Sequence, residues 1–357
     1  MSGHDFHKGI SKHAPLGGVV GLAAGIFHSI VLKQDGSVWS TGASSDARFV
    51  EVMSSRAMAV DAGTGYSIVL KKDGSVWTTD EPNAKSSFLN RSKTIRRTFS
   101  VVRIITDAKA VAAGTYHSIV LTQEGHVWAS GWNKHGQLGD SLTSYTSRFF
   151  ATISSGTKVL AVAAGDMHSI VLKEDGSVWA AGRNCNGQLG DGSKADRSSF
   201  VKVISGGAAG VTAGRDHSML LKQDGSVWAT GRNEYGQLGD GSTTDRISYV
   251  KVVSSGVKTV AAGSQHSMIL KQDGSVWTTG HNGYGQLGHG SAVDNQVFVA
   301  AVSVGVKVVA AGAFHSMVVK EDGSIWATGS NKYGQFGDGS QTSECRFVRL
   351  APFGDGT

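Results

Sequence analysis

The sequence predicts an all-β protein, a seven-bladed β-propeller of four-stranded antiparallel blades, and three observations support this. One phrase, Ala-Gly-x-x-His-Ser followed by Asp-Gly-Ser-Val-Trp, recurs with small variations along the 357 residues. No copy has a sustained helical period, and each holds short β-type runs between glycine-rich turns. The copies are marked by seven tryptophans, spaced 38, 51, 51, 49, 49 and 49 residues apart: Trp39, Trp77, Trp128, Trp179, Trp228, Trp277 and Trp326.

Each copy should fold as one small sheet, as the unit from Val257 to Val299 illustrates. Asp273-Gly274 joins two β-rich runs, and this pair is a strong hairpin signal because glycine adopts positive φ without steric cost. The glycine-rich loop 282–288 then leads to a last run. The four expected strands are 259–262, 266–271, 275–279 and 297–299.

Sheets of this size cannot bury both faces alone, so we expect them to stack radially; seven lies within the roughly four to eight blades of closed propellers. The first unit begins at 19–25 without a preceding strand, whereas 347–350 matches the fourth strands of other units. We therefore expect the C-terminal strand to complete and close the first blade, which removes an open sheet edge. Residues 19–351 form a single propeller in this interpretation, between flexible tails at 1–18 and 352–357.

Composition narrows the class further. The chain has 49 glycines, 3 prolines and 40% hydrophobic residues, which fits a packed globular fold and excludes collagen and proline-rich disorder. No apolar run reaches the roughly 18 residues of a membrane helix, and the start lacks the pattern of a signal peptide. Two cysteines cannot make a disulfide framework, so we expect a cytoplasmic or nuclear location. The net charge of +6 permits an acidic partner without requiring one.

The full repeat reads Ala-Ala-Gly-x-x-His-Ser-x-x-Leu-Lys-x-Asp-Gly-Ser-Val-Trp-x-x-Gly-x-Asn-x-x-Gly-Gln-Leu-Gly-Asp-Gly, and it resembles the repeat of the regulator of chromosome condensation family. The likeness covers residues 19–351. The resemblance implies a seven-bladed propeller, in agreement with the repeat count. The copies that keep the Asn and Gly-Gln-(Leu/Phe)-Gly element start that element at Asn133, Asn184, Asn233, Asn282 and Asn331.

The residues that recur should serve the fold rather than chemistry. Histidine stands in six copies and Tyr66 in the other. A residue needed once per blade points into every blade alike, where it would satisfy buried backbone groups. A serine follows each histidine, but neighbours on a strand face opposite sides, so this adjacency makes no Ser-His catalytic pair. One carboxylate per Asp-Gly-Ser loop falls short of a calcium site. We therefore expect no enzyme active site, no metal and no cofactor.

Function should lie where the copies differ, because a propeller keeps its scaffold and varies its loops. The two residues between Gly and His vary, and they should gather around the channel mouth on one face. Their mixture of aromatic and charged side chains is typical of a protein-binding surface; a face without a specific partner is the alternative. The predicted partner-binding residues are Phe27, Tyr116, Asp166, Met167, Arg215, Asp216, Gln265 and Phe314.

The family resemblance implies a second function. Some members are guanine nucleotide exchange factors for a small GTPase, and acidic residues in these connections contribute to their GTPase-binding face. Asp166 and Asp216 stand at matching connections of adjacent blades. The units leave no spare length for the wedge that such members push toward the nucleotide. Plant ultraviolet-sensing relatives place tryptophans in these connections, and their absence here argues against photoreception.

A basic segment, 78–103, replaces the glycine-rich loop of the second unit. Three interpretations stay open: a solvated loop, a patch that contacts phosphate or lipid, and a nuclear import address. Its basic residues are Lys85, Arg91, Lys93, Arg96, Arg97 and Arg103.

The leading prediction is a monomeric, non-catalytic scaffold that binds a protein partner through loops on one face. The alternative is an exchange factor for a small Ran-like GTPase. A third hypothesis is docking to chromatin or DNA through the basic segment, which predicts binding that weakens steeply with salt.

Overall fold

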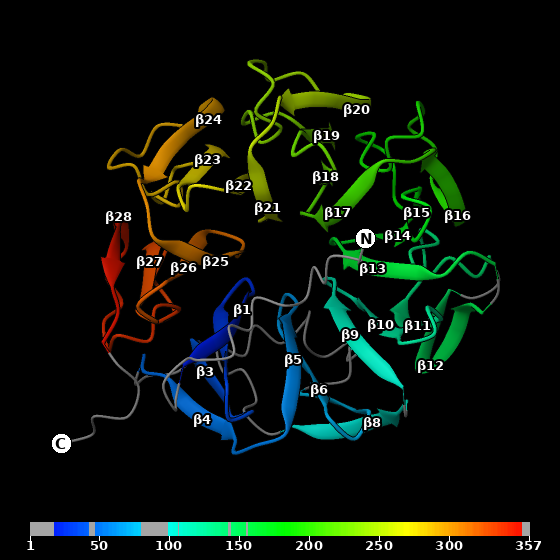
Figure 1. Cartoon of the computed structure of the whole chain (residues 1–357), viewed down its shortest axis with the longest axis horizontal. Coiled ribbons are helices and arrows are strands. Elements are labelled where there is room, and N and C mark those ends of the chain that lie inside the picture. The colour runs from blue at the N-terminus through cyan, green and yellow to red at the C-terminus, as the bar shows by residue number, and fades with distance from the viewer. Residues whose placement is uncertain are drawn as a thin grey trace.

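Seven β-sheets form a closed ring around a central channel, and they follow one another in chain order (Figure 1). The structure is a computed structural model. Each sheet has four antiparallel strands, and the described residues form no helix. The predicted all-β, seven-bladed propeller is therefore confirmed. The structure describes residues 18–42, 47–79, 99–105, 107–141, 144–154 and 156–351.

Every blade is one contiguous stretch of chain. The strands of blades 1 to 3 are β1 (Val19–Ala24), β2 (His28–Lys33), β3 (Val38–Gly42), β4 (Val50–Met53), β5 (Ala57–Ala62), β6 (Ser67–Lys71), β7 (Ser75–Thr78), β8 (Ser100–Ile104), β9 (Ala108–Ala113), β10 (His117–Thr122), β11 (Val127–Trp132) and β12 (Tyr145–Ile153). Those of blades 4 and 5 are β13 (Val159–Ala164), β14 (His168–Lys173), β15 (Val178–Gly182), β16 (Arg197–Ile204), β17 (Ala208–Ala213), β18 (His217–Lys222), β19 (Val227–Gly231) and β20 (Arg246–Val253). Those of blades 6 and 7 are β21 (Val257–Ala262), β22 (His266–Lys271), β23 (Val276–Gly280), β24 (Asn295–Val302), β25 (Val306–Ala311), β26 (His315–Lys320), β27 (Ile325–Gly329) and β28 (Glu344–Arg349).

The antiparallel order gives the ring two different faces. The first strand of each blade lines the channel and the fourth lies at the rim (Figure 1). Connections from first to second strand and from third to fourth strand share one face, which we call the loop face. The Asp-Gly turns and the links to the next blade lie on the opposite turn face. Function that depends on variable loops is therefore expected on the loop face.

The recurring Asp-Gly-Ser-Val-Trp phrase builds the turn face. Asp224 Oδ1 accepts the backbone N–H of Ser226 at 2.8 Å, and the indole N–H of Trp228 donates to the Ser226 hydroxyl at 3.1 Å. The ammonium of Lys222 lies 4.6 Å from the centre of the indole ring, a cation–π contact. These contacts fix the turn, so the phrase recurs for a structural reason.

The C-terminal strand does not complete the first blade, so this part of the prediction is wrong. Strand β28 pairs with β27 inside blade 7, and blade 1 has its own fourth strand, β4. The reason is that the first unit shortens its last loop but keeps the strand after it. Side chains close the ring instead: Val19 shares a hydrophobic cluster with Met317 and Phe336. Asp338, in the last loop, forms a β-bridge with Arg48.

Neighbouring blades are also joined by a closed ring of buried hydrogen bonds. Nε2 of His168 lies 2.9 Å from the hydroxyl of Ser218 in the next blade. That hydroxyl donates to the Gln188 carbonyl at 2.6 Å, so Nε2 carries the proton and donates. In blade 2 the Tyr66 hydroxyl takes this place, 2.9 Å from Ser118. The equivalent pairs are His28–Ser67, His117–Ser169, His217–Ser267, His266–Ser316 and His315–Ser29.

The recurring histidines thus serve the fold, as predicted, but their partner is a hydroxyl of the next blade rather than a backbone group. Burial keeps them neutral and lowers the pKa of His168 to about 3 and that of His217 to about 4. The glycine three residues before each histidine has a steric role. A Cβ on Gly165 would lie 2.3 Å from the His168 ring and 2.5 Å from the carbonyl oxygen of Gly214.

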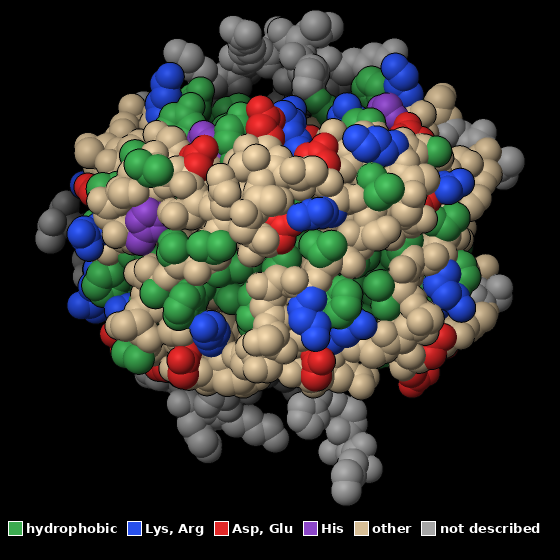
Figure 2. Space-filling view, turned by 90° about the horizontal axis from the view of Figure 1, so that it is seen from above, with side chains coloured by type: hydrophobic (Ala, Val, Ile, Leu, Met, Phe, Trp, Pro, Cys, Tyr) green, Lys and Arg blue, Asp and Glu red, His purple; other side chains and the backbone are tan. Residues whose placement is uncertain are grey.

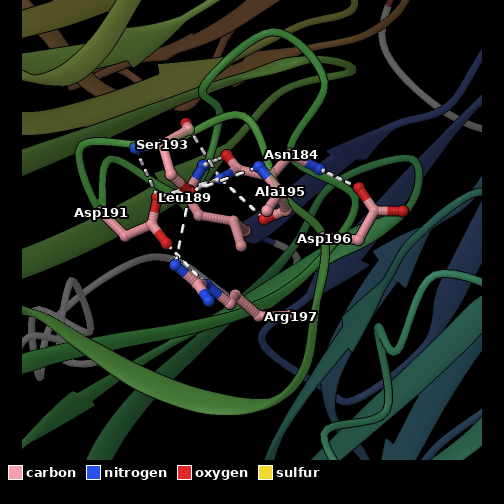
Figure 3. A network of polar contacts seen from close by, with 7 residues as sticks. All are labelled: Asn184, Leu189, Asp191, Ser193, Ala195, Asp196 and Arg197. Carbon is pink, nitrogen blue, oxygen red and sulfur yellow. Dashed lines mark hydrogen bonds and ion pairs between the residues drawn. The ribbon is translucent and has the colours of Figure 1, made fainter.

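In blades 3 to 7 the recurring asparagine hydrogen-bonds across the loop between the third and fourth strands, as Figure 3 shows for blade 4. In blade 4, Asn184 Nδ2 donates to Asp191 Oδ1 at 2.9 Å and to the carbonyl oxygens of Ser193 and Ala195 at 3.1 and 3.0 Å. Its Oδ1 accepts the backbone N–H of Leu189 at 3.0 Å. The loop is therefore a stable platform for the side chains that it displays.

Candidate functional site

The central channel is lined mainly by valine and alanine side chains, with a cavity volume of about 290 Å³. Among the strand residues that line this cavity, Asp61 is the charged one, at a position where the other blades have alanine or threonine. Its two oxygens accept the backbone N–H groups of Ala62 and of Ala113 in the next blade, both at 2.8 Å. Burial raises the pKa of Asp61 to about 6 in spite of these bonds. The carboxylate links blades 2 and 3 inside the channel.

The first residues of the variable pairs surround the channel mouth on the loop face, as predicted. Side chains of blades 2 to 5 are connected there. The hydroxyl of Thr64 donates to that of Thr115 at 2.7 Å, and Thr115 donates to Asp166 Oδ1 at 2.6 Å. Arg215 Nε lies 3.5 Å from Asp166 Oδ2. Burial raises the pKa of Asp166, although the Thr115 bond and Arg215 oppose that shift.

Asp216 is surrounded by three arginines, and we call this group the arginine hub. Arg183, Arg215 and Arg232 each place a nitrogen 3.5 to 3.8 Å from a carboxylate oxygen of Asp216. The Asp216 side chain is only 7% exposed, whereas the arginine side chains are 30 to 48% exposed. Asp216 was predicted to contact a partner directly. The structure places it beneath the surface, where it holds the arginines that are exposed.

A second group on the loop face is aromatic, and we call it the aromatic arc. The ring of Phe314 lies 5.2 Å from that of Tyr284, and the arc continues through His281 to Tyr235 at 6.1 and 4.8 Å. Tyr284 is 50% exposed. Two separate pairs lie elsewhere on this face, with centroid distances of 4.9 and 5.6 Å: Phe27–Tyr333 and Tyr116–Trp132.

The predicted site residues thus divide into two groups. Phe27 and Phe314 each contact an aromatic ring of a third-to-fourth-strand loop, and Tyr116 contacts Trp132 at the end of β11. Asp166, Arg215 and Asp216 form one charged network. The half-buried Met167 and Gln265 lie between them and use their carbonyl oxygens to accept the N–H groups of Arg183 and His281 at 2.8 Å.

Sequence reasoning missed the loop residues that complete both groups. The position after the last glycine of the third strand holds Trp132, Arg183, Arg232, His281 and Ser330 in successive blades. It varies from copy to copy as strongly as the predicted pairs do. The same rule that selected those pairs therefore selects this position as well.

The ring of histidines and serines offers no reactive site. The six inter-blade pairs place Ser next to His, but both side chains are buried in each of these pairs. Within the described ranges, no three histidine, cysteine or acidic side chains gather in a way that could hold a metal ion. Asp191 of the Asp-Gly-Ser loop is bonded to Arg197 Nε at 2.7 Å. Its carboxylate is therefore already used by the protein.

The basic segment cannot be placed in this arrangement. Lys85, Arg91, Lys93, Arg96 and Arg97 lie outside the described residues, and Arg103 is described only as part of the backbone of β8. Strand β7 ends and β8 begins on the loop face, where Thr78 pairs with Ser100. On the side of the ring that Figure 2 shows, basic and acidic side chains are interspersed.

Comparison with known proteins decides the family. A family model described as the RCC1-like domain matches residues 7–297 and 147–356, which together span most of the chain. The chain belongs to this family. The resemblance read from the repeat is therefore confirmed, and the RCC1-like domain accounts for the propeller as a whole.

Curated relatives of this RCC1-like domain match it over short stretches. The ultraviolet-B receptor UVR8 of Arabidopsis thaliana is 36% identical over 99 residues, which is 26% of this chain and 21% of that protein. The regulator of chromosome condensation of Drosophila melanogaster is 37% identical over 105 residues, 28% of this chain and 19% of that protein. The chain thus spans only about a fifth of the length of these relatives.

Solved structures match the RCC1-like domain over nearly its whole length. Human WBSCR16 has a TM-score of 0.74 at 24% identity and covers 86% of this chain and 84% of its own. Prp20p of Saccharomyces cerevisiae, described with its binding to Gsp1p and histones, has a TM-score of 0.65 at 20% identity, covering 94% and 77%. At these identities the likeness establishes the fold alone. No helix suited to crossing a membrane occurs in the part of the chain that the structure describes.

Proposed function

We propose that this RCC1-like domain is a non-catalytic, monomeric scaffold that binds a protein partner through its loop face. One observation carries the proposal: the loop face brings together the aromatic arc and the arginine hub. Tyrosine, tryptophan and arginine dominate the energetics of protein interfaces. The loops that display them are held by buried asparagines, so few degrees of freedom are lost on binding. Nuclear location fits the relative named for chromosome condensation, and cytoplasmic location stays a prediction.

The proposal is tested by affinity capture of protein partners, with variants of the loop face and one variant of the turn face. Tyr284→Ala with Phe314→Ala alters the arc, and Asp166→Ala with Arg215→Ala alters the charged network. Val304→Ala, an exposed apolar residue of the turn face, is the matched control. We expect the captured partner to be lost with the loop-face variants and kept with the control. Equal capture by all variants, with unchanged circular dichroism, would remove the loop face from the proposal.

A second candidate is nucleotide exchange on a small Ran-like GTPase. Two observations favour it: a relative is the regulator of chromosome condensation, and the structure of Prp20p was described with its binding to Gsp1p. Of the two predicted acids, Asp166 has the carboxylate that is exposed enough to meet a basic GTPase surface, at 28% against 7% for Asp216. Asp216 is covered by its arginines.

The exchange candidate is tested by release of mantGDP from a panel of small GTPases of the nuclear-transport class. Acceleration by the wild type that is lost in Asp166→Ala and in the Asp166→Ala/Asp216→Ala double variant supports exchange. No acceleration across the panel leaves the scaffold proposal alone. Docking to chromatin or DNA through residues 78–103 stays a separate prediction, checked by the salt dependence of binding to duplex DNA.

A further inference from the structure

The arginine hub selects a particular partner chemistry. We propose that the hub binds a carboxylate side chain of a protein partner, with an aromatic or apolar neighbour of that carboxylate on the aromatic arc. In this proposal Asp216 is a positioning residue that does not touch the partner. The inference rests on the proposed function, since it names the kind of protein segment that the loop face receives.

The geometry of the hub leaves N–H donors for a further acceptor. The three guanidinium groups come from separate segments: the loop after β15, the connection between β17 and β18, and the loop after β19. Asp216 draws them together, and Gln188 Nε2 adds a hydrogen bond to its Oδ1 at 3.4 Å. A guanidinium has five N–H donors, so one buried carboxylate leaves most of them for other acceptors. The planar fork of arginine matches a carboxylate in two parallel hydrogen bonds.

The other acids near the hub are distributed unevenly over its three arginines. Asp166 lies against Arg215, and Glu234 contacts Arg232. Arg183 has no second carboxylate within ion-pair distance among the residues that the structure describes. The Arg232–Glu234 pair is exposed, and exposed pairs contribute little to stability. An incoming carboxylate can therefore bridge Arg183 and Arg232 at small cost.

The charge balance around the hub favours an acidic protein segment over a nucleic acid. Three arginines and three carboxylates balance within this network, and two of the carboxylates, Asp166 and Glu234, are 28% and 52% exposed. A phosphate backbone would place further negative charges against them. A protein segment can place a single carboxylate at Arg183 and follow it with uncharged residues. Tyr235, the next residue after Glu234, begins the aromatic arc, so a segment with its carboxylate at the hub can place an aromatic or apolar neighbour on the arc.

The experiment measures fluorescence anisotropy of labelled peptides with the full chain. The probe is a twelve-residue peptide that alternates glutamate with phenylalanine and glycine; the comparison probes replace glutamate with glutamine or with lysine. The protein variants are Arg183→Gln and Arg232→Gln. Lys332→Gln, an exposed cation of the loop face outside the hub, is the matched control. Single-stranded oligothymidylate is included as the competing polyanion.

We expect the glutamate peptide to bind more tightly than the other two, and each arginine variant to weaken it about tenfold, as loss of one charge-assisted pair predicts. Lys332→Gln should change it less than about twofold, the size of a rim charge effect. Equal binding of glutamate and glutamine peptides, no binding below about 1 mM, or equal losses in all three variants would overturn the inference. Tighter binding of the oligonucleotide, lost in the same variants, would overturn it in favour of nucleic acid.

These outcomes are distinct from failure of the proposed function. If the arc variants Tyr284→Ala and Phe314→Ala lose a captured partner while Arg183→Gln does not, the scaffold survives and the hub does not select its partner. If the peptide binds through the hub while no loop-face variant affects capture, the hub binds carboxylates but the partner-binding face lies elsewhere.

Discussion

At the scale of single residues, the two acids predicted for the partner face turn out to have different roles. Asp166 stands at the channel mouth with part of its carboxylate exposed, whereas Asp216 is buried under three arginines. Both lie between the glycine and the histidine of a repeat, but Asp166 is the first residue of its pair and Asp216 is the second. The first position faces the channel mouth, and neighbours in other segments add to the difference, since Arg183 and Arg232 converge on Asp216 from the two flanking loops.

This difference predicts unequal effects on stability. Asp216→Ala removes the buried carboxylate that forms ion pairs with three guanidinium groups and accepts a hydrogen bond from Gln188, so we expect it to lower the free energy of unfolding by about 1–3 kcal/mol. Asp166→Ala should cost less than about 1 kcal/mol, because solvent can replace its partly exposed carboxylate. Urea unfolding followed by tryptophan fluorescence measures both. Equal losses of stability in the two variants would show that the buried carboxylate of Asp216 does not hold the three arginines in place.

At the scale of elements, the loop between third and fourth strands depends on one asparagine. The Asn184 side chain satisfies backbone groups at both ends of its loop, and the loop then reaches blade 5, where Asp191 forms a β-bridge with Ser248. The recurring Gly-Gln-Leu-Gly element is thus part of the joint between blades as well as of the loop itself.

Replacing this asparagine should loosen the loop without unfolding the ring. Asn184→Ala leaves buried donors and acceptors unpaired, at a cost of about 1–3 kcal/mol, and we expect faster amide hydrogen exchange over residues 184–197. Asn186 is half-buried in the same loop, and Asn186→Ala is the matched control. It should change neither the free energy of unfolding nor the rate of amide hydrogen exchange. Protection equal to the wild type in Asn184→Ala would contradict the role assigned to this side chain.

At the scale of the whole molecule, the ring of buried histidines couples stability to pH. The six imidazoles have folded-state pKa values of about 3 to 4, whereas an unfolded histidine titrates near 6.5. Below about pH 6.5 the unfolded chain binds protons that the folded ring does not bind, so stability is full above this pH and falls as pH decreases. Asp61 acts in the opposite sense, since its folded pKa of about 6 lies above its ordinary value.

We therefore expect the urea midpoint to fall steeply between about pH 7 and pH 5, with an upper limit of roughly 1.4 kcal/mol per histidine per pH unit. Asp61 binds one proton in the folded state, so it offsets only the loss of stability that a single histidine causes. Tryptophan fluorescence across the pH range measures the midpoints, and His126→Gln, at an exposed site, should leave the profile unchanged. A flat profile would mean that the histidines do not enter the fold neutral.

The sequence by itself determined the fold of this protein. The repeat recurs because every blade needs the same glycine, histidine, Asp-Gly turn and tryptophan. These residues make contacts within one blade or with the next blade, so the sequence of a single unit specifies them. The number of blades and the variable pairs of the loop face follow from reading those units in register. The position after the last glycine of the third strand, which was missed, could have been found by the same comparison of units.

Only the tertiary structure decided how the ring closes and which loop residues act together. The C-terminal strand resembles every other fourth strand, so its sequence could not tell whether it pairs with β27 or with the first blade. In the structure it pairs with β27, and the ring is closed by packing of β25 and β26 against β1 and by the bridge between Asp338 and Arg48. The arginine hub joins Arg183, Arg215 and Arg232 from two blades around one buried carboxylate. Burial and inter-blade distance depend on how blades stack, and no single unit encodes that.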